Sequence, residues 1–238
     1  MNIVSDMDWL DGTAISQTGF EGGLESEVQQ NLVPLDNELL KRTMDIVITL
    51  TLGLALLPIL LFVALLIHLD APGPIFYTQE RLGKDGHKIR IYKFRSMHVN
   101  ADKVLAEYLA ENPSAREEWL RNQKLRNDPR VTRTGKWIRQ FSIDEIPQLF
   151  NVLKGDMSVV GPRPIMLEQK ALYGHGIDLY RSVRPGLTGF WQVSGRNHTS
   201  FHQRTLFDIY YIRNWSVWLD IHILFRTVWV VLSRDGAY

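Results

Sequence analysis

The stretch IVITLTLGLALLPILLFVALLI, residues 46–67, decides how the rest of the chain is placed. It contains 22 residues and no charged side chain. A bilayer core of about 30 Å needs about 20 apolar residues in a helix, so this stretch is long enough to span a membrane. The sequence therefore predicts an apolar helix, which either crosses the bilayer or enters it and returns.

Pro58 stands near the middle of the apolar stretch and favours a return. A proline inside a helix removes one backbone hydrogen bond and clashes with the preceding turn, so the helix is expected to bend there. At about 1.5 Å per residue, residues 46–57 rise about 18 Å and residues 59–67 about 13 Å. Each arm reaches about halfway through the bilayer, which predicts a re-entrant membrane helix kinked at Pro58.

Basic residues flank the apolar stretch on both sides. Lys41 and Arg42 precede it, and six more follow it: Arg81, Lys84, Lys88, Arg90, Lys93 and Arg95. Because positive flanks tend to stay on the cytoplasmic side, a single crossing would place one flank unfavourably. A monotopic arrangement satisfies both flanks. A kinked single span remains open as the alternative, because proline is tolerated in true spans.

The charges divide the chain into two parts. Residues 1–40 carry eight acidic side chains and no Lys or Arg, which leaves 27 basic and 18 acidic side chains in the remainder. We interpret residues 1–38 as an acidic flexible tail with too little apolar surface to offset the entropy of ordering. The basic remainder favours anionic partners such as phosphorylated substrates, acidic lipid headgroups or nucleic acid. The chain has no cysteine, so a thiolate metal site or a cysteine nucleophile is excluded.

Two segments after the apolar helix have clear local signals. Residues 76–94 contain two strand-like segments around Gly83 and Asp85-Gly86, which predict a small β-hairpin. Residues 101–123 predict a helix that is broken or bent near Asn112-Pro113.

The C-terminal segment 215–232 is apolar and aromatic, yet it contains Asp220, His222 and Arg226. Charges of this kind make a buried span costly, so we expect an amphipathic helix at the membrane interface or one packed under the domain. The whole pattern indicates an α+β fold: a mainly helical monotopic membrane protein with a re-entrant helix, a small β-hairpin and interfacial amphipathic helices.

The segment RQFSIDEIPQLFNVLKGDMSVVGPRP, residues 139–164, is the densest in chemically useful groups. Asp144 and Glu145 are adjacent acids, and consecutive helical side chains point about 100° apart, so one can attack while the other holds a metal or moves a proton. Arg139, Lys154 and Arg163 surround them in sequence, and guanidinium groups match phosphate oxygens. Carboxylates beside arginines predict chemistry on a phosphate ester with Mg²⁺.

A purely structural role for these acids also remains open. Ser142 is placed to cap a helix whose first turn contains Asp144 and Glu145, where negative charge favours the helix dipole. Capping and catalysis do not exclude each other.

Several motifs together resemble the bacterial sugar transferase family, the monotopic phosphoglycosyl transferases that act on polyprenyl phosphate. They are KRTMDIVITL, the stretch interrupted by Pro58, APGPIFYTQERLGKDG, IYKFRSM, SIDEIPQLFNVLKGDMSVVGPRP, RPGLTGFWQVSGRN and LDIHILFRTVWVVLSRDGAY. The resemblance covers residues 39–238 in order and identifies them as a catalytic domain. Within the family, FWQVSGRN and the terminal RDGAY resemble the undecaprenyl-phosphate galactose phosphotransferases.

The resemblance implies a role for each matching residue. Asp144 is similar to the nucleophile that attacks the sugar-bearing phosphate of a UDP-sugar, and Glu145 to the partner that binds Mg²⁺ and can accept a proton. Asp220 matches the acid of the C-terminal LDI motif, placed among the substrate-binding positions. The basic positions suited to the diphosphate and to the lipid phosphate are Arg81, Lys93, Arg95, Arg139 and Arg163.

The resemblance also implies the partners and the cellular place. They are a UDP-sugar, undecaprenyl phosphate and membrane lipids, with no nucleic acid, and a homodimer is suggested. The expected location is the bacterial inner membrane with the catalytic domain on the cytoplasmic face.

Alternatives to these implied roles stay open. Galactose is favoured as the sugar and glucose comes next, because no residue separates the two epimers. A non-catalytic membrane-anchored module that binds acidic lipids is the competing function. Arg81 and Lys93 can simply border the hairpin, and Asp220 can pair with a nearby Arg.

Overall fold

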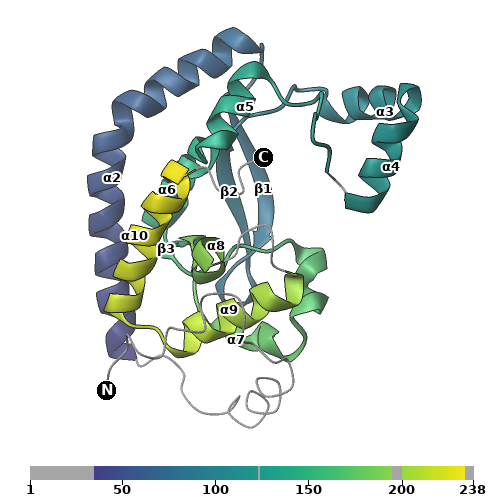
Figure 1. Ribbon diagram of the computed structural model, residues 1–238. Helices are drawn as coiled ribbons and strands as arrows, with labels where there is room; N and C mark the ends of the chain where they lie inside the picture. Colours follow the sequence, from purple (N-terminus) through teal and green to yellow (C-terminus); the bar gives the residue numbers. More distant parts are fainter. Residues whose placement is uncertain (1–34, 123, 195–199, 234–238) are drawn as a thin grey trace.

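The computed structural model describes residues 35–122, 124–194 and 200–233, whose arrangement is shown in Figure 1. A long helix, α2 (Leu35–Asp70), runs along one side of the molecule, and the other elements pack beside it. In Figure 1 this helix changes direction before its C-terminal end and continues across the top. The protein is mostly helical with a small antiparallel hairpin, as the sequence predicts.

Helix α2 contains the predicted apolar stretch. Among the described residues it is the one helix that is long and apolar enough to cross a membrane. Its apolar side chains stay exposed along much of its length, with Leu54 and Leu61 at 72% and 64% exposure. A continuous surface of large exposed apolar side chains is typical of a site that contacts a membrane or another protein.

The N-terminal boundary of α2 differs from the tail that we assigned to residues 1–38. The helix begins at Leu35, and Glu38 in its first turn forms ion pairs with Lys84 and Arg184, at 2.6 and 3.0 Å. These charge pairs give the residues just before the apolar stretch a partner on the domain. The rest of the predicted tail, residues 1–34, lies outside the described part of the chain.

The predicted hairpin is confirmed. Strands β1 (Phe76–Leu82) and β2 (Lys88–Phe94) pair antiparallel, with Phe76 opposite Phe94 and Leu82 opposite Lys88. The tight connection is made by Lys84–Gly86, in which Asp85 has a φ of 55°. Aspartate tolerates this left-handed conformation better than most residues, which explains the turn at this position.

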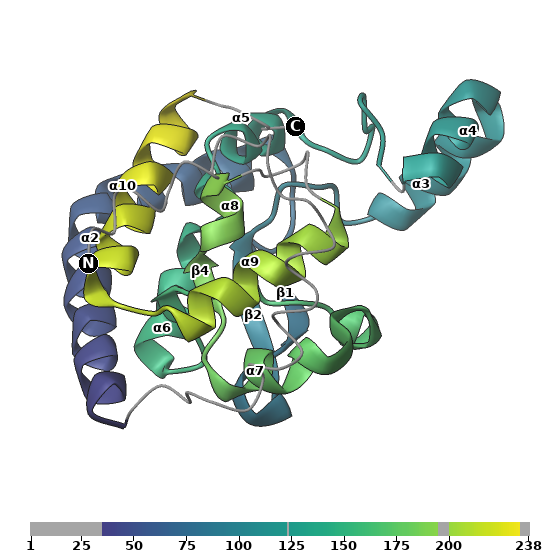
Figure 2. The ribbon, with the colours of Figure 1, turned by 60° about the horizontal axis from the view of Figure 1, so that its bottom comes forward.

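The broken helix predicted over residues 101–123 is confirmed as well. It forms α3 (Ala101–Glu111) and α4 (Pro113–Asn122), with the break at Asn112. Proline suits the first position of a helix and disfavours helical conformation in the residue before it, so Pro113 both ends α3 and starts α4. Figures 1 and 2 show these two helices projecting from the body as an arm.

A second sheet was not predicted from the sequence. It consists of two short parallel strands, β3 (Ser158–Val160) and β4 (Gly186–Thr188). Gly186 is required here by close packing, because a Cβ at this position would lie 2.1 Å from the backbone nitrogen of Gly161.

The remaining helices cover these sheets. They are α5 (Arg133–Gln140), the 3-10 helices η3 (Ile143–Gln148) and η4 (Leu167–Gly176), α6 (Leu149–Lys154), α7 (Ile177–Ser182), α8 (Phe190–Ser194), α9 (Phe201–Arg213) and α10 (Val217–Ser233). The predicted C-terminal amphipathic segment corresponds to α10. Its exposed side carries Trp218, Phe225 and Trp229, at 75%, 75% and 74% exposure.

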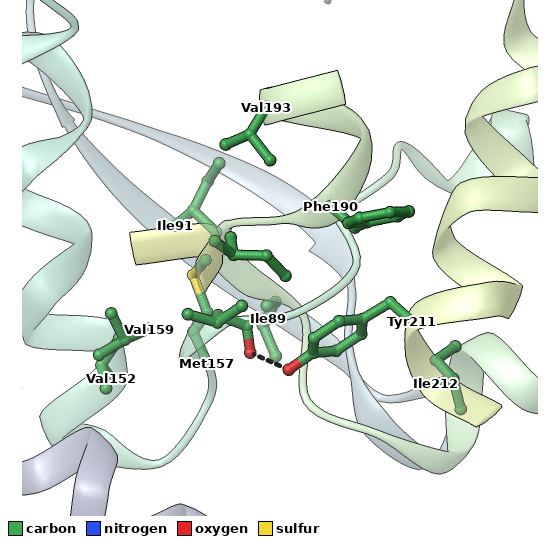
Figure 3. Packing of buried hydrophobic residues seen from close by; sticks show 11 residues of the cluster. Ile89, Ile91, Val152, Met157, Val159, Phe190, Val193, Tyr211 and Ile212 are labelled. Atoms are coloured by element: carbon green, nitrogen blue, oxygen red, sulfur yellow. Dashed lines mark hydrogen bonds between the residues drawn. The ribbon is translucent and has the colours of Figure 1, made fainter. Parts of the chain in front are cut away.

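The main core lies between β2, β3, α6, α8, α9 and α10. Figure 3 shows Ile89 and Ile91 of β2 with Met157 and Phe190 around them. Tyr211 reaches into this core from α9, and its single O–H is shared between the carbonyl of Val160, at 3.0 Å, and the carboxylate of Asp220, at 2.7 Å. A buried tyrosine needs such a partner, and this one ties α9 to β3.

Both ends of α2 are fixed to this same body. At the N-terminal end, Arg42 donates to the carbonyls of Val152 and Leu153 at the end of α6, at 2.6 and 2.8 Å. Near the C-terminal end, Val63 and Ile67 pack with Phe94 of β2 and Ile138 of α5 in a buried cluster. The two ends of the long helix therefore lie against one domain.

Candidate active site

A cavity of about 910 Å³ opens beside the hairpin and contains the Asp144-Glu145 pair. Its volume lies in the upper part of the range of small-molecule sites, roughly 300–1,000 Å³. Basic side chains dominate its polar lining: Lys93, Arg95, Lys124, Arg130, Arg139, Arg163 and Arg204. The acidic lining residues are Asp102, Asp144 and Glu145. A cavity with this charge attracts an anionic ligand.

The backbone around Ser142 sets the position of the two central acids. Helix α5 ends after Gln140, and Ser142 adopts a left-handed conformation (φ 55°, ψ 21°) before η3 begins at Ile143. The strand β2 and the 3-10 helix η3 pack against each other, which brings Lys93 to the acids. Ser142 does occupy the N-cap position, but its side chain makes no capping hydrogen bond. Ser142 is therefore the N-cap residue, as predicted, but its hydroxyl does not form the capping hydrogen bond.

Glu145 is held by two cations. Its Oε1 accepts from Lys93 Nζ at 2.7 Å and from Arg163 Nη2 at 2.8 Å, and the Glu145 side chain is 17% exposed. Burial alone would raise the pKa of this carboxyl, but the charges of Arg163 and Lys93 and their hydrogen bonds outweigh it and hold the pKa well below its usual range. Glu145 is thus ionised at any physiological pH.

Asp144 has the opposite environment. Burial, followed by the negative charge of Glu145, raises the pKa of Asp144 to about 6, although Lys93 and Arg139 act against this. A carboxylate that is poorly solvated and not tied to a cation is a better nucleophile than one inside an ion pair. The two adjacent acids therefore differ: Glu145 is an anion paired with two cations, and Asp144 is a buried carboxyl with a raised pKa.

Two of the predicted basic residues, Arg139 and Arg95, differ in what they contact. Arg139, in the last turn of α5, lines the cavity and donates from Nε to Ser96 Oγ at 2.8 Å. Arg95 also lines the cavity, but its guanidinium donates to the carbonyls of Ala71 and Pro72 just after α2. This contact makes Arg95 a positioning residue that joins the hairpin to the end of the apolar helix.

Arg81 lies near Glu145 and is not among the residues that line the cavity. Its Nη2 donates to Gln79 Oε1 at 2.6 Å. Burial and then the charge of Arg163 lower its pKa, whereas the charge of Glu145 raises it. Arg81 is thus within electrostatic reach of Glu145. Lys154, which the sequence also placed near the acids, instead forms an exposed ion pair with Asp156 at 2.9 Å.

Asp220 lies away from the cavity. It is 1% exposed in α10 and pairs with Lys41 of α2 at 2.6 Å, so its basic partner is a lysine and not the arginine considered above. Tyr211 donates to its Oδ1 at 2.7 Å and Trp215 to its Oδ2 at 3.2 Å. All of these contacts join α2, α9 and α10, so the geometry gives Asp220 a structural task.

Two lining residues were missed from the sequence. Trp191 of α8 is 8% exposed, and the guanidinium of Arg204 of α9 lies over its ring at 4.6 Å from the ring centre. Arg204 is 13 residues beyond Trp191 in the chain, in a segment without any phosphate-binding pattern. The FWQVSGRN motif was a signal for Trp191, whereas only the three-dimensional structure brings Arg204 to it.

The acids fit a Mg²⁺ ion that is shared with a substrate. Among the described residues there is no cluster of three His, Asp or Glu side chains that would form a complete protein site. Mg²⁺ commonly binds through one or two carboxylates and the substrate phosphates, and Asp144 and Glu145 are the carboxylates in the cavity that would hold it. Glu145 would have to loosen a contact with Lys93 or Arg163 to become a ligand.

A comparison with protein families matches residues 36–234 to the family described as bacterial sugar transferase. The chain belongs to the bacterial sugar transferase family. This confirms the resemblance seen in the motifs, and one of those motifs, SIDE, lines the cavity with Ser142, Asp144 and Glu145.

Relatives within the family carry informative names. The undecaprenyl-phosphate galactose phosphotransferase of Salmonella typhimurium is 48% identical over 211 residues, which cover 89% of this chain and 44% of the relative. The exopolysaccharide production protein ExoY of Sinorhizobium fredii is 43% identical over 198 residues, 83% of this chain and 88% of the relative. The UDP-glucose:undecaprenyl-phosphate glucose-1-phosphate transferase of Escherichia coli is 41% identical over 211 residues, 85% of this chain and 42% of the relative. The chain thus spans less than half of the Salmonella and Escherichia relatives and most of the Sinorhizobium one.

Proposed function

We propose that this sugar transferase moves a hexose 1-phosphate, galactose 1-phosphate in the first instance, from a UDP-sugar to undecaprenyl phosphate and releases UMP. The reaction would be the first membrane step of exopolysaccharide, capsule or O-antigen synthesis. The observation that carries the proposal is the contrast within the cavity. Asp144 has a pKa raised to about 6 and stands among arginines, while its neighbour Glu145 is locked in ion pairs.

The proposed chemistry has two balanced steps. A carboxylate oxygen of Asp144 attacks the phosphorus that bears the sugar, and the bond from that phosphorus to the bridging oxygen breaks, so that UMP leaves with the electron pair. An anionic oxygen of undecaprenyl phosphate then attacks the same phosphorus. This second step frees the Asp144 carboxylate and forms undecaprenyl-diphosphate-sugar. Splitting the transfer in this way lets one cavity serve a soluble substrate and a lipid in turn.

The other residues of the cavity position and neutralise the phosphates. Phosphoryl transfer is accelerated chiefly by positioning and by stabilising charge, which Arg139 would supply near Asp144 and Arg163 beside Glu145. Glu145 holds Lys93 and Arg163 in place at 2.7 and 2.8 Å. A Mg²⁺ ion bound by the two acids and the diphosphate would neutralise further phosphate charge.

The proposed activity is tested by measuring which nucleotide is released. Purified protein is incubated with undecaprenyl phosphate, Mg²⁺ and a panel of UDP-sugars, and UMP and UDP are quantified. We expect UMP, with UDP-galactose the best donor, and UDP-glucose the main competitor because relatives of both names exist. UDP instead of UMP would indicate an ordinary glycosyltransferase.

The control for this assay is Asp144→Asn, which keeps the size of the side chain. We expect UMP release to fall by about 10⁴-fold or more, as on removal of other covalent nucleophiles. Turnover retained in this variant would refute the nucleophile assignment. Binding of acidic vesicles without any UMP release in the unmodified protein would favour the non-catalytic lipid-binding module.

We also propose that α2 is re-entrant, with both ends on the cytoplasmic face. Three observations support this: Pro58 inside the helix, the change of direction in Figure 1, and the packing of both ends against one domain. A straight helix of 36 residues would extend about 54 Å and separate its ends across the bilayer.

The topology can be tested by single-cysteine labelling, since the chain has no cysteine of its own. Leu39 and Leu69 are 75% and 70% exposed near the two ends of α2. In spheroplasts we expect neither Leu39→Cys nor Leu69→Cys to react with a membrane-impermeant maleimide, and both to react after permeabilisation. Labelling of one position alone in intact spheroplasts would show that the helix spans the membrane.

A further inference from the structure

The lining of the cavity comes from two separate stretches of the chain. Residues 74–99, which run from the end of α2 through the hairpin, contribute Pro74, Phe76, Phe94, Met97 and Val99 beside polar residues such as Lys93, Ser96 and His98, and we term the apolar ones the apolar side. Helices α8 and α9 contribute Trp191, Gln192 and Arg204, which we term the polar side. Asp144 and Glu145 belong to η3, between these two groups in the chain. The two substrates of the proposed reaction differ in the same manner, since one is a polar nucleotide and the other a long hydrocarbon.

The apolar side is joined to the end of the apolar helix. Arg95 donates to the carbonyls of Ala71 and Pro72, which directly follow α2, and this holds the segment 95–99 against the end of the helix. Phe76 and Val99 remain 51% and 67% exposed there. Exposed apolar side chains at the place where a membrane helix ends offer a path for hydrocarbon.

Arg139 is the cation of this apolar side. Its Nε donates to Ser96 Oγ at 2.8 Å, three residues before Val99. Burial lowers the pKa of Arg139 and the charge of Asp144 raises it, so the guanidinium stands within reach of that carboxyl. An anionic headgroup with its hydrocarbon along Phe76 and Val99 would meet Arg139 first.

Arg204 is the corresponding cation of the polar side. Its guanidinium is stacked over the buried ring of Trp191 at 4.6 Å, which fixes its plane at the cavity wall. Burial and then the charge of Arg163 lower the pKa of Arg204, and the charge of Asp208 raises it. Arg204 is close enough to Arg163 to feel its charge, and Arg163 in turn is bonded to Glu145. The carboxylates whose charge raises the pKa of Arg139 are instead Asp144 and Asp128.

The position of α9 agrees with this division. In Figure 1 the C-terminal end of α2 lies at the top of the molecule beside α5, whereas α9 crosses its lower half. The end of α2, from which a hydrocarbon would enter, is therefore separated from α9, the helix that carries Arg204. Two adjacent arginines, Arg163 and Arg204, favour a bound phosphate because it relieves their mutual repulsion.

We propose that the cavity is divided about Asp144 into a nucleotide end, where Arg204 on Trp191 binds the phosphate that leaves with UMP, and a lipid end, where Arg139, Phe76 and Val99 receive undecaprenyl phosphate. This inference rests on the proposed function. It deepens that function by assigning the two arginines to different half-reactions.

The test measures the two half-reactions separately. UMP release is followed with donor alone, and the preformed sugar-phosphate adduct is then discharged with increasing undecaprenyl phosphate. For Arg204→Gln we expect the KM for the UDP-sugar and the inhibition constant of UMP to rise about tenfold to a hundredfold, the effect of losing a charged hydrogen bond. The concentration of undecaprenyl phosphate needed to remove the sugar-phosphate adduct should be the same as in the unmodified protein.

A matched variant at the other end gives the reverse pattern. For Val99→Asp, an exposed position, we expect the concentration of undecaprenyl phosphate needed for discharge to rise at least about tenfold, because a charge is placed on the hydrocarbon path. UMP release from the donor should be unchanged. Arg121→Gln, on the projecting arm with a side chain 74% exposed, controls for the loss of one positive charge.

The outcomes distinguish this inference from the proposed function. If Arg204→Gln alters lipid discharge as much as UMP release, or if Val99→Asp alters the donor KM, the division is overturned. Should Arg204→Gln fold poorly, Arg204→Lys and direct UMP binding to the unmodified protein and to this variant replace it, and equal UMP affinity would overturn the inference. Unmodified protein that binds UMP but releases none from any UDP-sugar contradicts the proposed function alone.

Discussion

Two groups of acids in this molecule belong to motifs of the family and have different surroundings in the structure. Asp144 and Glu145 line an open cavity, where Glu145 has two cationic partners and Asp144 has a raised pKa. Asp45 and Asp220 lie in the closed joint between α2, β3 and α10, each no more than 2% exposed. There Lys41 contacts both carboxylates, and Ser158 donates to Asp45 at 2.9 Å.

The difference separates an acid that is open to a ligand from one that is closed to it. Both groups belong to motifs that resemble those of the family, and both are next to basic residues. The closed group has its hydrogen-bonding capacity filled by side chains and backbone, so nothing remains for a ligand. The open group leaves one carboxylate poorly solvated beside a charged cavity, which is the arrangement that favours chemistry.

The largest effect on stability is expected from breaking the closed group. Asp220→Ala removes the partner of Lys41 and Tyr211 and should lower the free energy of unfolding by about 3–5 kcal/mol, as for other buried ion pairs that lose one member. The melting temperature in detergent measures this. The double variant Asp220→Ala with Lys41→Met should recover part of the loss, and an unchanged melting temperature in Asp220→Ala would contradict a structural role.

A smaller stability effect of opposite sign is expected at Asp144. Its pKa is raised from 3.8 to about 6, so the folded state binds the proton more tightly and loses stability as the pH rises through this range. Asp144→Asn removes this penalty and should stabilise the protein at pH 7.5 by up to about 3 kcal/mol, at about 1.4 kcal/mol per pKa unit. At pH 4 the difference should nearly vanish. A variant equally stabilised at both pH values would argue against the raised pKa.

The same raised pKa should limit the reaction in acid. In the proposed mechanism only ionised Asp144 attacks, so kcat/KM for UMP release should fall about tenfold per pH unit below pH 6 and reach a plateau above pH 7. Glu145 should add no titration in this range, because its pKa is held well below its usual value. A plateau that continued down to pH 4.5 would show that Asp144 is ionised like an ordinary surface acid.

The smallest expected effect concerns the backbone beside the open group. Ser142 has a φ of 55° without a side-chain capping bond, a conformation that costs a residue other than glycine about 1 kcal/mol. Ser142→Gly should therefore leave the protein as stable or more stable by up to about 1 kcal/mol. Thermal denaturation checks this, and a clear destabilisation would indicate that the Ser142 hydroxyl has a structural task.

Local patterns allowed the hairpin, the broken helix over residues 101–123 and the apolar helix to be predicted from the sequence. Each depends on neighbours in the chain: Asp85-Gly86 for the turn, Pro113 for the break and the uncharged stretch for α2. The parallel pair β3 and β4 was not predicted, because each strand has three residues and the two are brought together across a long connection. Pairing at such distance leaves no short-range signal.

The site was predictable where one motif contains it and not where the fold assembles it. Asp144, Glu145 and Arg139 are neighbours in sequence, and they remain neighbours around the cavity. Arg204 comes from a helix more than 50 residues later, and Arg95 turns its guanidinium to the end of α2, so neither role can be inferred from spacing. Sequence patterns identify reactive groups, whereas the partners that tune them depend on tertiary packing.

The most direct test of the central claim is mass spectrometry of protein trapped with the UDP-sugar alone, without undecaprenyl phosphate. We predict a hexose-phosphate adduct on the peptide that contains Asp144, which disappears when undecaprenyl phosphate is added and is absent from Asp144→Asn. UMP release without any adduct on that peptide, under conditions that preserve acyl phosphates, would contradict the covalent mechanism and with it the distinction drawn between the two groups of acids.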